Sequence, residues 1–177
     1  GHRGLHPWFL ESLPSGYGRI MDDAQTYFRI ERLLADYARA IDDDRLEDWP
    51  DFFAPDCLYK IISTENFDQG LPLGIIHADS QAMLQDRVSS IRRANIFEDH
   101  RYKHFVSATQ IIDVDGDIVH SISNYQVIRI DVRGNAMLFS VGKYLDVIDL
   151  GGDRPLFREK VVVFDNERID TLLALPL

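Results

Sequence analysis

The chain has 177 residues, of which 19 are Lys or Arg and 29 are Asp or Glu, so its formal net charge is −10 at pH 7. An acidic chain does not neutralise phosphates, which argues against nucleic acid or an anionic lipid surface as a partner. Apolar residues make up 45% of the chain, and this length suffices for one sizeable core, which predicts one globular domain.

Membrane spans and metal clusters built on cysteine are also excluded. No stretch approaches the ~20 consecutive apolar residues of a spanning helix. Cys57 is the only cysteine, so no internal disulfide, cysteine-based zinc site or complete iron–sulfur ligand set can form. The preceding Asp56 disfavours a thiolate, so a buried structural thiol and a cytoplasmic location are expected.

Residues 1–20 differ in composition from the rest of the chain. Glycines and prolines stand among aromatic residues there, without the apolar run of a signal peptide. Position 1 is Gly, and Met21 directly precedes a helix-like segment. We interpret residues 1–20 as an N-terminal extension or a vector-derived remnant, and residues 21–177 as a single domain.

The first half of the domain has the pattern of helices. Residues 24–41 carry apolar side chains at steps of three and four, which predicts an amphipathic helix. Asp44 and Glu47 have the spacing that caps a new helix start, so a short second helix carrying Trp49 and Phe52 is expected. Next come a strand near residues 58–62 and a third helix beginning after Asp79 and Ser80.

After residue 100 the apolar period changes from helical to two. The strand-like runs span residues 105–112, 117–131, 136–148 and 156–164. Glycine-containing turns separate them, which predicts an antiparallel meander. Helices followed by a long antiparallel sheet indicate the α+β class, with a curled sheet wrapped on a helix as an open cone.

A cone of this kind can hold a pocket at its mouth. Acid–base chemistry there would come from inward-pointing Tyr, His and Asp side chains. The candidates are Tyr59, His77, His104, His120 and Asp146. The alternative is that these side chains only fill the sheet faces. No nucleotide-binding loop or nucleophile elbow is present.

His100 and His104 are four residues apart with Asp99 beside them, which matches a two-His, one-carboxylate metal site only on a helix. Here the residues straddle the start of a predicted strand, so the spacing loses that meaning. We predict no metal site and expect His104 to pair with a carboxylate or a main-chain carbonyl.

Some residues are candidates for contact with another subunit, because aromatic and basic side chains are enriched at interface centres. These are Trp49, Phe52, Arg101 and His104. The alternative is that the aromatic cluster belongs to the core and that the basic side chains are solvated.

From Tyr27 onward the sequence resembles the small (β) subunits of Rieske non-haem iron aromatic-ring-hydroxylating dioxygenases. The segments that carry the resemblance are WPDFFAPDCLY (49–59), NIFEDHRYKH (95–104), YLDV (144–147), REKVVVFD (158–165) and DTLLALPL (170–177). The tail and ENFDQGLP (65–72) look most like subunits that serve terephthalate, salicylate and anthranilate.

The resemblance implies a cystatin-like, nuclear-transport-factor-2-like cone and a heterohexamer of three α and three β chains. It places the Rieske cluster, the mononuclear Fe(II) and the oxidation of an aromatic, carboxylate-bearing compound in the α chain, with electrons from NADH. This chain would then be a structural subunit without a cofactor or catalytic residues. The alternatives are a stand-alone cone-fold dehydratase, isomerase or cyclase, and a non-catalytic carrier of a small ligand.

Overall fold

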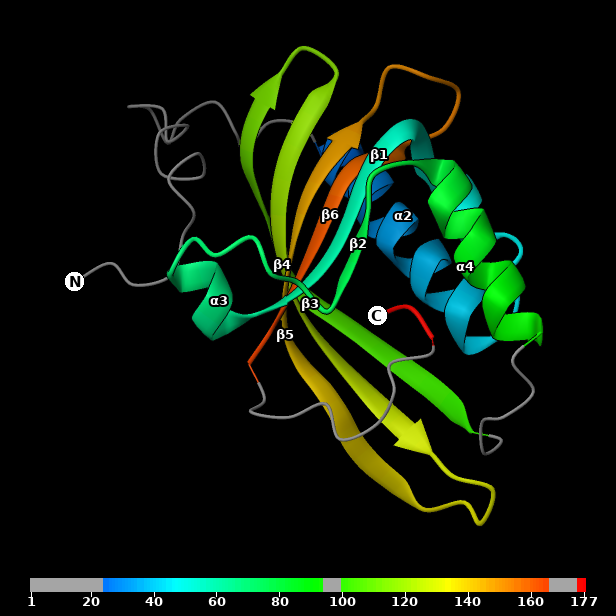
Figure 1. The fold of residues 1–177 in the computed structure, drawn as a ribbon. Helices are drawn as coiled ribbons and strands as arrows, with labels where there is room; N and C mark the ends of the chain where they lie inside the picture. Colours follow the sequence, from blue (N-terminus) through cyan, green and yellow to red (C-terminus); the bar gives the residue numbers. More distant parts are fainter. Residues whose placement is uncertain (1–23, 94–99, 166–174) are drawn as a thin grey trace.

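The computed structural model describes residues 24–93, 100–165 and 175–177, and Figure 1 shows their arrangement. The two longer helices lie against one face of a curled six-stranded sheet, so the predicted α+β cone is confirmed. Residues 1–20, interpreted above as an extension or remnant, lie outside the described part.

The long helix α2 runs over Ala24–Asp42, close to the predicted 24–41. Its apolar stripe packs on the sheet because residues three and four apart share one face of a helix. The buried members of the stripe are Ile30, Leu33, Leu34, Tyr37, Ala38, Ala40 and Ile41. This helix is the floor of the cone.

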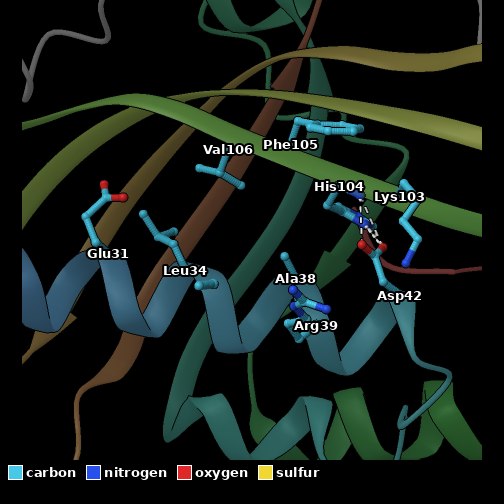
Figure 2. A pocket seen from close by; sticks show the side chains of 10 residues that line it. Glu31, Leu34, Ala38, Arg39, Asp42, Lys103, His104, Phe105 and Val106 are labelled. Atoms are coloured by element: carbon cyan, nitrogen blue, oxygen red, sulfur yellow. Dashed lines mark hydrogen bonds and ion pairs between the residues drawn. The ribbon is translucent and has the colours of Figure 1, made fainter.

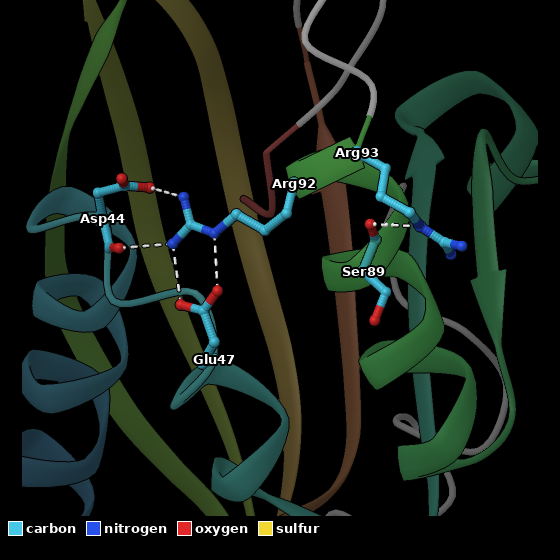
Figure 3. A network of polar contacts seen from close by, with 5 residues as sticks. All are labelled: Asp44, Glu47, Ser89, Arg92 and Arg93. Atoms are coloured by element: carbon cyan, nitrogen blue, oxygen red, sulfur yellow. Dashed lines mark hydrogen bonds and ion pairs between the residues drawn. The ribbon is translucent and has the colours of Figure 1, made fainter.

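The expected capping of a second helix by Asp44 and Glu47 is wrong. Asp44 adopts a left-handed backbone conformation with φ 56°, and both acidic side chains accept hydrogen bonds from Arg92 (Figure 3). The predicted second helix is a single 3-10 turn, η2 (Trp49–Phe52), and the following residue already begins a strand.

The remaining elements follow with short connections. In chain order they are β1 (Phe53–Ser63), α3 (Thr64–Asp68), β2 (Ile76–Ala78), α4 (Gln81–Arg93), β3 (Arg101–Asp115), β4 (Ile118–Ile130), β5 (Ala136–Asp149) and β6 (Leu156–Phe164). Strands β3 to β6 form the predicted antiparallel meander.

The sheet order is β2-β1-β6-β5-β4-β3. Strand β1 pairs in parallel with β6, with Leu58 opposite Glu159. The local sequence pattern did not predict this pairing, because the two strands lie about a hundred residues apart in the chain and no turn joins them.

The two faces of the sheet have different coverings. Side chains of the inner face, such as Tyr125 and Val127 on β4, join the main core under α2 and α4. On the outer face, α3 places Phe67 over a smaller apolar cluster that includes Leu145 and Val163. Toward the β4–β5 turn the outer face carries the exposed Leu138.

Strand β3 is one edge of the sheet, and α2 protects part of it. The main-chain N–H of His104 donates to both carboxylate oxygens of Asp42, at 3.2 and 3.0 Å. A carboxylate at this place occupies a donor that an added strand would need. The end of α2 therefore closes the β3 edge around His104.

Candidate functional site

The inside of the cone is filled by large side chains. The fully buried aromatic residues are Tyr37, Trp49, Phe53, Tyr59, Tyr125, Tyr144 and Phe157. They contact one another with ring centroids between 4.5 and 6.5 Å apart, mostly edge to face, which is a favourable geometry for aromatic pairs. Tyr125 and Tyr144 are stacked with an interplanar angle of 3°.

A buried ion pair lies among these rings. Lys160 on β6 and Asp146 on the neighbouring strand β5 are directly opposite each other in the strand register. The Lys160 Nζ lies 3.1 and 3.2 Å from the two carboxylate oxygens. Both side chains have no exposed surface. The Lys160 Nζ also lies 3.6 Å from the Tyr144 ring centroid and 4.5 Å from that of Phe157.

The ring contacts give the ammonium additional stabilisation, because the faces of aromatic rings attract cations. Burial raises the pKa of Asp146 above its ordinary value, and the ammonium opposes that rise. Burial likewise lowers the pKa of Lys160, and the carboxylate opposes that fall. Each charge is held in the core by the other.

Two of the tyrosine hydroxyls inside the cone, those of Tyr37 and Tyr59, are bound by the last described segment of the chain. The Tyr37 hydroxyl donates to the main-chain oxygen of Leu177 at 2.6 Å, and the Leu177 N–H donates to the Tyr59 hydroxyl at 3.1 Å. Leu177 has no exposed surface. Burial raises the pKa of Tyr59 to about 12, so these hydroxyls are neutral hydrogen-bonding groups at ordinary pH.

The structure does not bring the five acid–base candidates to one place. Tyr59 and Asp146 lie on the inner face and are bound as described. His120 pairs with Val147, and His77 with Lys60, so both histidines lie on the outer face, since alternate strand residues point to opposite sides.

His104 lies at the end of a groove between α2 and β3, shown in Figure 2. The groove has a volume of about 390 Å³ and is lined by Leu34, Ala38 and Val106, among others. The His104 Nδ1 lies 2.7 Å from Asp42 Oδ1, and the two side chains are 0% and 8% exposed. The expectation that His104 pairs with a carboxylate is confirmed.

A carboxylate only accepts hydrogen bonds, so the His104 Nδ1 carries a proton and donates it to Asp42. The His104 Nε2 is buried and has no hydrogen-bond partner among the described residues. The pair joins the last residue of α2 to the first half of β3. Its evident role in this geometry is to hold the helix on the sheet edge.

The four candidates for subunit contact differ in exposure. Trp49 is fully buried in the core, and the His104 side chain is covered as well. Phe52 is half-buried, and Arg101 is exposed at the start of β3. Of this set, Phe52 and Arg101 are the two with exposed side-chain surface.

Two other properties concern the described residues as a whole. No helix among them is long and apolar enough to cross a membrane. They contain no group of three or more His, Cys, Asp or Glu side chains placed to hold a metal ion. Asp99, from the spacing discussed above, lies outside the described residues. Cys57 is free and buried, as expected.

Sequence reasoning missed the roles of Lys160, Asp42 and Leu177. A signal existed for Lys160, because it alternates with Val162 and Phe164 in a strand whose other inward residues are apolar. Asp42 is the first of three consecutive aspartates, and nothing local distinguishes it from the other two. The contact of Leu177 with Tyr59 joins residues 118 positions apart.

The curled sheet on a long helix, with its filled interior, defines a nuclear-transport-factor-2-like cone protein. A family model described as "Ring hydroxylating beta subunit" matches residues 36–171. The chain belongs to this family: it is a β subunit of an aromatic-ring-hydroxylating dioxygenase, as the resemblance implied.

Relatives and a solved structure agree with this assignment. The chain is 40% identical to the anthranilate 1,2-dioxygenase small subunit of Burkholderia cepacia, over 89% of this chain and 98% of the relative. It is 41% identical to the terephthalate 1,2-dioxygenase terminal oxygenase component subunit beta 2 of Comamonas sp., over 84% of this chain and 97% of the relative.

The solved structure is assigned as the β subunit of an aromatic-ring-hydroxylating dioxygenase from Novosphingobium aromaticivorans. It superposes with a TM-score of 0.80 at 38% identity, covering 87% of this chain and 99% of that chain. The resemblance to subunits of the terephthalate and anthranilate type is therefore confirmed.

Proposed function

We propose that this chain is the non-catalytic structural subunit of a cytoplasmic dioxygenase that oxidises an aromatic compound bearing a carboxylate. Its α partner would hold the Rieske cluster and the mononuclear Fe(II) and would receive electrons that originate from NADH. The assembly would contain three α and three β chains. The relatives are subunits of dioxygenases named for anthranilate and terephthalate, both aromatic carboxylates, which supports this substrate class.

The observation that carries the structural role is the state of the cone interior. Asp146, Lys160 and Tyr59, three of the inward polar groups that an acid–base enzyme would use, are occupied by one another or by Leu177. A general acid or base must reach the substrate proton directly or through one water. These three groups have no exposed surface and support a packed core.

A structural subunit stabilises its partner by binding only the folded assembly. The surface for this contact would include Phe52 and Arg101, which are exposed or half-buried. The acidic remainder of the surface keeps the particle soluble.

The test is co-purification. The tagged chain is expressed with the α-type gene next to its own, and the particle mass, the chain ratio and the visible spectrum are recorded. We expect a brown complex with equal numbers of the two chains and turnover of an aromatic carboxylate. The variant D146V/K160M, which makes the filled interior fully apolar, should retain this turnover.

The stand-alone enzyme makes the opposite prediction. A colourless chain that purifies alone and turns over a cone-fold substrate would refute the proposal, above all if D146V/K160M abolished that turnover while the chain stayed folded. Circular dichroism of the variant provides the folding control.

A further inference from the structure

The groove between α2 and β3 has an apolar floor. Its volume is about 390 Å³, which is in the range of sites that hold small organic molecules. Leu34 and Val106 line it, and so do Ala35 and Ala38. The two alanines are three residues apart and share one face of α2, where their short side chains leave space that a larger residue would fill. The groove therefore has room for an apolar body.

Two cationic side chains line this groove from its opposite walls. Arg39 is exposed in the last turn of α2. Lys103 is exposed on the edge strand β3, and Figure 2 shows its side chain running toward α2. Neither cation forms an ion pair or a side-chain hydrogen bond with any residue that the structure describes, whereas Arg32 and Arg45 on the same side of the molecule pair with nearby carboxylates.

The two carboxylates that line the groove are engaged with other groups of the chain. Asp42 accepts hydrogen bonds from the His104 ring at 2.7 Å and from the His104 main-chain N–H at 3.0 Å. Glu31 interacts with the Tyr27 phenol, since burial and this carboxylate together raise the pKa of Tyr27. Glu31 is also eight residues from Arg39, about 12 Å along a helix axis. Among the described lining residues, the unpaired charges are therefore both positive.

We propose that this groove binds a small carboxylate with an apolar body of about one ring. The carboxylate would lie between Arg39 and Lys103, and the body would lie on Leu34 and Ala38. This site goes beyond the proposed structural role, which assigns no ligand to this chain. A guanidinium can bind both oxygens of a carboxylate, and the ammonium adds a second positive charge. An anion is favoured because a neutral molecule of the same shape gains only the apolar contact.

The test is titration of the full chain with benzoate, followed by the NMR shifts of the main-chain amides of Ala35, Ala38 and Val106. We expect these shifts to saturate with a Kd below about 2 mM, an affinity within reach of so small a ligand. Benzamide has the same shape without the charge and should bind at least about tenfold more weakly. Added salt should weaken the binding of benzoate, since both cations are exposed and are screened.

Separate variants test the cations and the apolar floor. R39Q/K103Q removes both cations and should weaken benzoate binding at least about tenfold. The control R93Q/R133Q removes two exposed cations outside the groove, so the charge change is the same, and its Kd should stay within about twofold of wild type. Ala35 is exposed on α2, so A35F can fill the groove without changing the charge. It should also weaken binding at least about tenfold, with an unchanged circular dichroism spectrum.

Several results would overturn the inference. One is that the groove amides of wild type do not saturate with a Kd below about 2 mM benzoate. Another is that R39Q/K103Q and R93Q/R133Q bind benzoate equally well, or that benzamide binds as tightly as benzoate, because the cations would then have no part in binding. A folded A35F chain with wild-type affinity would place the ligand outside the groove and would refute the site.

The same variants separate this inference from the proposed function. R39Q/K103Q should still co-purify with the α chain in the wild-type ratio, since the groove is assigned to a small molecule. If this variant instead loses the α chain and wild type does not bind benzoate, the groove belongs to the contact with α and the inference is wrong. If wild type captures no α chain but binds benzoate with the expected dependence on both cations, only the proposed function fails.

Discussion

Removing the ammonium of Lys160 should destabilise the fold more than any surface substitution. In K160M the Asp146 carboxylate stays in the core with neither an ion-pair partner nor solvent, since both side chains are fully buried. At 3.1 Å and an effective dielectric constant of about 20, the lost attraction is roughly 5 kcal/mol. Breaking a buried pair from one side costs about 3–5 kcal/mol in proteins.

For a domain of this size, 1 kcal/mol corresponds to about 2–4 °C in Tm, so K160M should melt roughly 6–20 °C below wild type. D146V/K160M removes both charges and leaves an apolar pair in an aromatic pocket. Its free energy of unfolding should lie within about 1 kcal/mol of wild type or above it, because neither charge then has to be desolvated.

The assay is chemical and thermal unfolding of the three proteins at several pH values. In K160M the folded-state pKa of Asp146 is raised further above the unfolded value, so the folded state binds a proton more readily. Its stability should therefore increase as pH falls through that folded-state pKa, an effect that D146V/K160M should lack. A K160M loss under about 1 kcal/mol, or a double variant as unstable as K160M, would refute the reasoning.

Three other substitutions or treatments test separate features. Gly142→Ala should destabilise the fold by several kcal/mol, measured by urea unfolding, because an added Cβ would lie 2.0 Å from a main-chain oxygen of β6. In the control Gly152→Ala the nearest atom to the added Cβ is 3.7 Å away, so stability should change by less than about 0.5 kcal/mol. Arg92 holds the pKa of Glu47 at about 2. Wild type should therefore lose a small stabilisation, about 1 kcal/mol or less for an exposed pair, as pH falls from about 4.5 to 2. In acid titrations of stability, R92Q should show neither the stabilisation nor this pH dependence. Burial raises the pKa of Cys57 to about 11, so its reaction with a thiol reagent at pH 8 should be at least about a hundredfold slower in the native chain than in urea, and equal rates would show that the thiol is exposed.

Local pattern predicted much of the fold because most elements here depend on local periodicity. The buried stripe of α2 and the alternation in β4 are both visible in the sequence, and glycine turns mark the meander. Strand β3 is longer than predicted, because it begins at Arg101 rather than at residue 105. The charged residues Arg101 and Lys103 obscured that start, since they point outward from an exposed edge.

The failures have a common physical cause, which is interaction over long distances in the chain. Asp44 and Glu47 matched a capping pattern, but Arg92, more than forty residues away, binds both of them. The placement of His77 and His120 on the outer face followed from register with partner strands. Sequence spacing could name the five acid–base candidates but could not say which face each would occupy.

The parallel pairing of β1 with β6 has a consequence for the way the chain acquires its structure. Leu58 lies opposite Glu159, so β1 cannot be completed until nearly the whole chain has left the ribosome. Pairings between distant segments form slowly because a long loop must close first. Until then the core beneath α2 lacks the β6 side chains that complete it, such as Phe157, which contacts Tyr37. This interval is when the nascent chain is most prone to aggregation.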